Sequence, residues 1–230
     1  MLGAPRQGRD NEHRFPAALA IVVGAALYAA LPSSLTLGSR FVIPGLELVL
    51  LLPVLAYNPR RFTRETTWSR IVSLALVGVI GLANLFSLVL LIRALIQGAA
   101  TDSHKLLLAA LQIWLTNIIV FGLAYWELDR GGPVKRATLA RAELPPADLR
   151  FSQDEDADAV AEVAASASDH VDWAPVLVDY LYVSLTNSSA FSPTDTMPLS
   201  SRVKLLMGIQ ASSALIVSLL VIARAVGGLK

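Results

Sequence analysis

The chain has 230 residues, of which 54% are hydrophobic, 16% are charged and none is cysteine. Soluble domains carry about 25% charged residues, so this composition indicates a membrane protein. A net charge of +1 argues against a nucleic-acid partner, and the lack of cysteine excludes disulfides, thiol catalysis and Cys-ligated metals. Because the three histidines are scattered along the chain, no metal or other cofactor is expected.

Residues 1–14 are polar, carry three arginines and are interpreted as a cytoplasmic tail. Apolar runs of transmembrane or nearly transmembrane length follow, since about 20 residues cross the hydrocarbon core of a bilayer. These runs are Phe15–Leu31, Phe41–Tyr57, Ile71–Gln97, Leu106–Trp126 and Val203–Val226. Proline or glycine follows each of the first four runs and ends a helix there. Residues 15–126 are therefore predicted to be a four-helix transmembrane region.

Arginine and lysine are unevenly distributed between the two sides of these runs. The tail, the connection at 58–70 and the connection after residue 127 are basic, whereas the opposite side has little beyond Arg40 and Lys105. The basic side of a membrane protein faces the cytoplasm. The sequence thus predicts a multipass protein of the plasma (inner) membrane with a cytoplasmic amino terminus, and its composition favours a bacterial source. The lipid bilayer is its first expected partner.

Residues 127–172 form the one sizeable polar stretch between apolar runs. Its first half is basic, and its second half, including Asp154, Asp156 and Asp158, is acidic and rich in alanine. The spacing does not match a calcium-binding loop, which needs a glycine and a distal glutamate. We interpret the stretch as a cytoplasmic linker that is partly helical and partly disordered.

Two charged residues fall inside predicted spans, where charge is costly and often functional. Glu47 lies about two turns into the second run, and Arg93 lies about one turn from the end of the third. These depths match in an antiparallel hairpin, so we expect the two side chains to pair. The alternative is that Arg93 extends to the outer surface and leaves Glu47 protonated or in water.

Uncharged polar residues also occur within the runs, and we expect them mainly to bond one helix to another. On the third run, Asn84 and Ser87 share a face, and on the fourth run Gln112 and Thr116 share a face beside Asn117. No catalytic motif is present, and no histidine or lysine stands near the serines to activate them. The chain is not expected to be an enzyme.

Residues 173–230 are predicted to form a short helix, a polar turn and the last transmembrane helix. The turn is rich in hydroxyl groups, and irregular backbone at membrane depth survives only when protein or a watery cavity shelters it. Its expected lining residues are Thr186, Asn187, Ser188, Ser189, Ser192, Thr194 and Asp195. Asp179 is expected to hold the short helix through a neighbouring helix or an exposed backbone N–H group. The segment either enters and returns from the cytoplasmic side or crosses completely as a short sixth span.

This carboxy-terminal segment resembles the pore helix, filter and inner helix of potassium-channel-type proteins. The resemblance rests on Tyr180–Thr186, on Asp195 with Pro198, and on the final helix. Aligned on Asp195 and Pro198, residues 190–194 stand where that family has Thr-Val-Gly-Tyr-Gly, with Ser192 and Thr194 replacing the two glycines. In that family the glycines allow the backbone to adopt the conformation that stacks the carbonyl groups of the filter. Because this chain lacks both glycines, the resemblance does not imply potassium selectivity.

From about Ile71 onward, the chain also resembles an uncharacterised bacterial membrane-protein family of about this length. The shared features are an aromatic run like Ala124–Glu127, a break like Gly131-Gly132, the stretch beginning Asp179-Tyr-Leu-Tyr, and a serine–Asp turn before the last span. This resemblance implies a membrane location and a channel-like hairpin.

The sequence therefore predicts an all-α, polytopic integral membrane protein with five or six transmembrane helices. A re-entrant half-helix before the last span is one of its two arrangements. Two functions stay open: a channel-like protein that passes ions or small solutes as a homo-oligomer, and a non-conducting scaffold or interaction protein with an unknown protein partner.

Overall fold

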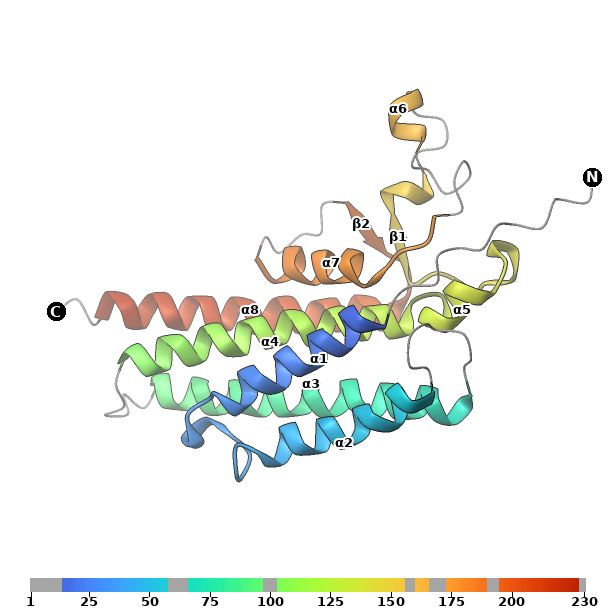
Figure 1. Cartoon of the computed structure of the whole chain (residues 1–230). Coiled ribbons are helices and arrows are strands. Elements are labelled where there is room, and N and C mark those ends of the chain that lie inside the picture. The colour runs from blue at the N-terminus through green and yellow to red at the C-terminus, as the bar shows by residue number, and fades with distance from the viewer. Residues whose placement is uncertain are drawn as a thin grey trace, which may run out of the picture.

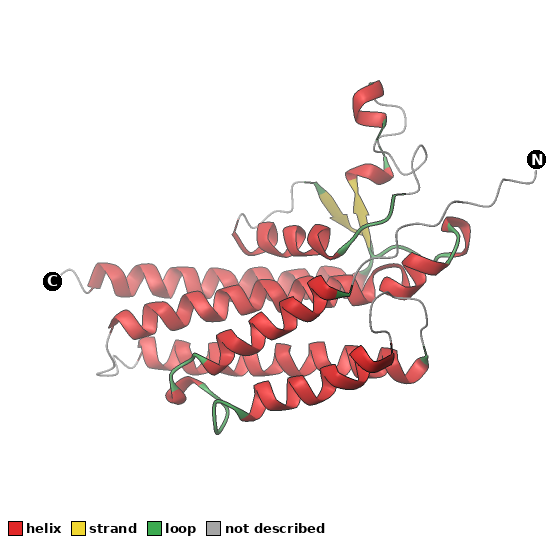
Figure 2. Cartoon of the chain, viewed as in Figure 1, coloured by secondary structure: helices red, strands yellow, loops and turns green. Residues whose placement is uncertain are grey.

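The computed structural model describes residues 14–57, 66–96, 103–155, 160–165, 173–189 and 195–227. The described chain is mostly helical, with one small two-stranded sheet (Figures 1 and 2). The main helices are α1 (Phe15–Ala29), α2 (Val42–Tyr57), α3 (Thr67–Ile96), α4 (Ser103–Leu128), α7 (Leu177–Ser189) and α8 (Ser201–Gly227). The shorter elements are η1 (Ser33–Leu35), η2 (Asp129–Gly131), α5 (Pro133–Thr138), η3 (Arg141–Glu143), β1 (Leu149–Phe151), η4 (Ser152–Asp154), α6 (Ala161–Ala164) and β2 (Thr196–Pro198).

Three helical segments are long and apolar enough to cross a membrane: Thr67–Ile96, His104–Gly131 and Ser201–Arg224. Phe15–Ala29 and Val42–Pro53 are shorter apolar helices. All of them coincide closely with the apolar runs of the sequence, because a continuous apolar run in lipid must satisfy its own backbone hydrogen bonds. Three helices of the described chain therefore have the length and composition needed to cross a membrane.

The long helices lie side by side in a bundle with α4 at its centre (Figure 1). α4 packs against α1, α3, α7 and α8, whereas α2 packs against α1 and α3. Two buried apolar clusters fill the bundle, one containing Leu76, Leu123 and Tyr180, the other containing Leu91 and Ile113. The outer faces are apolar too, and Leu82 on α3 is 70% exposed. A bundle that is apolar both inside and outside fits a lipid environment.

α7 is about half as long as α8 and lies along its first half (Figure 1). It runs antiparallel to α4, since Tyr180 meets Asp129 and Ser184 meets Ile118. After α7 the chain returns, and β2 pairs with β1 in antiparallel register, with Thr196 opposite Phe151. α7 and α8 thus begin at the same end of the bundle.

Part of the predicted linker between α4 and α7, over residues 129–151, packs against the bundle. Asp129, Asp148 and Leu149 are almost fully buried at the end of the bundle. Phe151 packs edge-on against the rings of Trp173 and Tyr180. The reason is that β1 brings apolar side chains under the start of α7, which composition alone does not show.

Candidate functional site

A buried polar network joins α4, α7 and α8 at the middle of the bundle. Its centre is the amide of Gln210 on α8, which is fully buried. The amide oxygen accepts hydrogen bonds from the Tyr125 hydroxyl at 2.7 Å and from Asn187 Nδ2 at 2.9 Å. The amide nitrogen lies 2.8 Å from Ser188 Oγ and 2.6 Å from Ser184 Oγ. One side chain therefore links α8 to both α4 and α7.

Backbone carbonyl groups extend this network along the same helices. Ser184 Oγ donates to the carbonyl of Ile118 on α4 at 2.7 Å, and Asn187 Nδ2 also contacts the carbonyl of Met207 at 3.0 Å. Buried polar groups in a low-dielectric interior are stabilising only when every member has a partner. Here the inner face of α7 is fully engaged with protein, so it is a packing surface.

Four of the seven residues expected to line a polar turn belong to the last turn of α7: Thr186, Asn187, Ser188 and Ser189. Asn187 and Ser188 belong to the Gln210 network. Thr186 Oγ1 and Ser189 Oγ donate to carbonyl groups of α7 itself. Asp195, beyond the helix, accepts a hydrogen bond from the Tyr182 hydroxyl at 3.0 Å. Ser192 and Thr194 lie outside the described residues.

A cluster centred on Asp129 fixes the first turns of α7. Asp129 is fully buried, and its Oδ2 accepts the Tyr180 hydroxyl at 2.6 Å and Arg130 at 2.7 Å. Its Oδ1 accepts the backbone N–H groups of Asp148 at 2.8 Å and Leu149 at 3.2 Å. The carboxylate thereby holds α4, α7 and β1 together.

Further charged groups support this cluster. The Arg136 guanidinium lies 4.9 Å from the Tyr180 ring centre and donates to the carbonyls of Trp126 and Asp129. Asp148 pairs with Arg202 in the first turn of α8, through Nε at 2.8 Å and through a second, shorter contact. Asp179 Oδ2 accepts the backbone N–H of Val176 at 2.7 Å, the second of the two roles expected for it. These contacts set where α7 and α8 begin.

The Glu47–Arg93 pair expected from the sequence is wrong. Glu47 is 1% exposed, and neither of its carboxylate oxygens has a hydrogen-bond partner in the described part of the chain. Arg93 is exposed on α3, two residues from the buried Leu91 and two from the buried Leu95. Since successive helical residues are about 100° apart, the side chain of Arg93 points away from the face that carries Leu91 and Leu95. Matched depth did not bring the two side chains onto facing surfaces.

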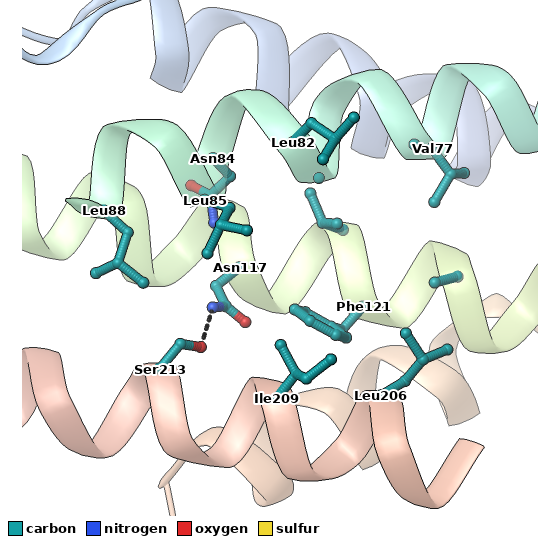
Figure 3. Close-up of a pocket in the computed structure, with 14 residues that line it drawn as sticks. Val77, Leu82, Asn84, Leu85, Leu88, Asn117, Phe121, Leu206, Ile209 and Ser213 are labelled. Carbon is teal, nitrogen blue, oxygen red and sulfur yellow. Dashed lines mark hydrogen bonds between the residues drawn. The ribbon is translucent and has the colours of Figure 1, made fainter. Parts of the chain in front are cut away.

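A groove about 280 Å³ in volume runs between α3 and α8, with α4 as its floor (Figure 3). Its walls are mostly apolar, and its polar groups are Asn84, Asn117 and Ser213. Asn117 Nδ2 donates to Ser213 Oγ at 2.9 Å, which bonds α4 to α8 as expected for Asn117. Asn117 Oδ1 is buried and has no partner in the described residues.

The other predicted intramembrane polar residues have local roles. Thr116 Oγ1 donates to the carbonyl of Gln112 one turn earlier on α4, at 2.9 Å. Asn84 lines the groove, and its neighbour on the α3 face, Ser87, is fully buried with no hydrogen-bond partner in the described chain. No three histidine, aspartate or glutamate side chains in the described ranges come together as metal ligands.

Sequence reasoning missed Gln210, Tyr125, Ser184 and Asp129, which are central to both clusters. A glutamine in the middle of an apolar run was the available signal for Gln210. Comparison with known proteins identifies no relative: no family model, curated protein or solved structure matches this chain. The site must therefore be interpreted from its own geometry.

Proposed function

We propose that this chain is a multipass membrane protein that acts by interaction within the bilayer and does not conduct through its carboxy-terminal hairpin. The observation that supports this proposal is the Gln210 network, in which the polar side chains on the inner face of α7 form hydrogen bonds to α8. A conduction path needs polar groups free to replace the hydration of a solute. These groups instead bond one helix to another.

The outer face of α7 supports the same proposal. The large exposed side chains of α7 are Val178, Tyr182 and Leu185, which are 66%, 49% and 41% exposed. They fall on one stripe of the helix, and two of them are purely apolar. Such a stripe suits lipid or a protein partner. It would be an unfavourable lining for a water-filled pore.

The proposed topology has five crossing helices and α7 as a re-entrant half-helix. The basic side chains at the end where α7 and α8 begin support a cytoplasmic location of that end: Arg14, Arg70, Lys135, Arg136, Arg141, Arg202 and Lys204. In this proposal the amino terminus is cytoplasmic, the carboxy terminus is outside, and the protein lies in the plasma membrane.

A channel-like function is the second candidate, because a half-length helix that enters the bundle and returns has the layout of a pore helix. Two assays separate the candidates. The first is flux of a panel of ions and small solutes through the purified chain in liposomes. The second is the reaction of single cysteines with a membrane-impermeant maleimide, which is clean because the chain has no cysteine.

For the second assay, Ser188→Cys lies in the buried network, and Met197→Cys on β2 is the exposed control. We expect no flux, rapid labelling at position 197, and labelling at position 188 only after denaturation. If the chain shows flux and labelling at position 188 blocks that flux, the non-conducting proposal is contradicted and the channel is favoured.

A further inference from the structure

We propose that the groove between α3 and α8 receives the α8 helix of a second copy of this chain. The inference rests on the proposed function, since it names the partner of an intramembrane interaction protein. In this dimer, Ser212 of each copy donates a hydrogen bond to Asn117 Oδ1 of the other copy. Each groove is then completed by a residue that its own chain does not supply.

The groove has one unsatisfied requirement, which is a hydrogen-bond donor for Asn117 Oδ1. Asn117 is 5% exposed, and its amide oxygen has no partner in the described chain although its nitrogen bonds Ser213. A buried acceptor without a donor costs about 1–3 kcal/mol. Figure 3 shows this amide facing the groove beside Ser213, between α3 and α8. A donor that enters the groove would satisfy it.

The depth of this acceptor favours a helix over a lipid as the occupant. Ser213, bonded to Asn117, lies twelve residues after the start of α8, or about 18 Å along a helix of about 40 Å. This is near the middle of the helix, where lipids have hydrocarbon rather than head groups. A polar side chain on a transmembrane helix can reach that depth.

Symmetry then selects which side chain of a second copy can serve. Copies inserted in the same direction are related by a twofold axis normal to the membrane, which preserves the depth of every atom. The donor must therefore come from the level of Asn117 itself. Ser212 meets this condition, because it is exposed and precedes the groove residue Ser213 on α8.

The surface of α8 around Ser212 also suits close helix contact. Gly208 lies one turn before Ser212 on the same exposed face, and a Cβ atom added to Gly208 would meet nothing within 4 Å. Small residues four apart let two membrane helices approach closely. On the opposite wall of the groove, Gly78 of α3 is also open, with nothing within 4 Å of an added Cβ.

Disulfide crosslinking in membranes tests this dimer. Leu205→Cys, on the exposed face of α8 one turn before Gly208, is the reporter and should form a crosslinked dimer on oxidation. In that background, Gly208→Leu and Gly78→Leu should each reduce crosslinking about tenfold, because one obstructs the entering helix and the other fills the groove. Ser212→Ala should reduce it about threefold through loss of one hydrogen bond.

The matched control is Gly45→Leu, on the exposed face of α2, where an added Cβ also meets nothing within 4 Å. It should leave crosslinking unchanged. No dimer from Leu205→Cys would overturn the proposal, as would a dimer that persists in Gly78→Leu. The proposal would also be overturned if the chain stays monomeric and copurifies with a lipid that is lost in the Gly78→Leu variant. None of these outcomes bears on conduction, which the flux assay measures separately.

Discussion

Asn187 on α7 donates a hydrogen bond of 2.9 Å to the side-chain oxygen of Gln210 on α8, twenty-three residues later in the chain. The Tyr125 hydroxyl on α4 donates to the same oxygen at 2.7 Å. Three helices therefore meet at one amide oxygen in the bundle interior. This relationship keeps α7 helical through Ser189 and places its polar groups against protein.

Replacement of Gln210 by leucine should destabilise the folded chain by about 2–4 kcal/mol. The change removes the partner of the Tyr125 hydroxyl, the donor to Ser188 Oγ and one of the two acceptors of Asn187 Nδ2 in a buried site. Each buried group left unsatisfied costs about 1–3 kcal/mol. Thermal unfolding in detergent measures the effect. Ile216→Leu, at an exposed position on the same helix, is the control and should shift the midpoint little. Equal midpoints for the two variants would contradict a central role for Gln210.

Gly122 on α4 allows α7 to approach closely. A Cβ atom at this position would lie 2.7 Å from Leu181 Cδ2 and 3.2 Å from Leu181 Cα. The Leu181 side chain would have to move, and the backbone of α7 would have to shift by a few tenths of an ångström. Gly122→Ala should therefore cost about 1–3 kcal/mol through overpacking. Gly45→Ala meets nothing within 4 Å and serves as the matched control. A Gly122→Ala variant as stable as the control would show that α7 does not pack there.

Asp129 should matter more than any one of its hydrogen-bond donors. Asp129→Ala removes one of the two carboxylates that pair with Arg130 and the acceptor for two buried backbone N–H groups, a change expected to cost about 3–5 kcal/mol. Tyr180→Phe removes one hydrogen bond to the carboxylate and should cost about 1.5–3 kcal/mol. Hydrogen exchange should show the largest loss of protection in β1 and the first turn of α7. A uniform loss over the whole bundle would contradict a local anchoring role.

Glu47→Gln should be tolerated or slightly stabilising, because the amide keeps the size of the side chain without a charge to desolvate. Glu47→Arg should be strongly destabilising at this buried position. Since Glu47 and Arg93 do not pair in the structure, adding Arg93→Glu to Glu47→Arg should not restore stability. The yield of folded protein after membrane extraction compares the variants. Rescue in the double variant would indicate that the two residues do pair.

The sequence alone determined where the helices lie. Each long apolar run became a helix within a few residues of its expected bounds, and prolines or glycines in the connections ended most of them. The reason is local: in lipid, a continuous apolar segment must satisfy its own backbone groups, so hydropathy and helix formation coincide. The short helix at 177–189 and a bond from Asn117 to another helix were also expected from local composition, whereas the sequence left open whether the short helix returns or crosses completely.

Only the tertiary structure decided which polar side chains meet. Glu47 and Arg93 have matched depths but point to different surroundings. Gln210, which no motif marks, gathers partners from α4 and α7, and Asp129 gathers partners from α7 and β1. Depth along a helix can be counted from the sequence. The rotation of one helix against another depends on how all of their side chains pack together, and a single pattern does not contain that information.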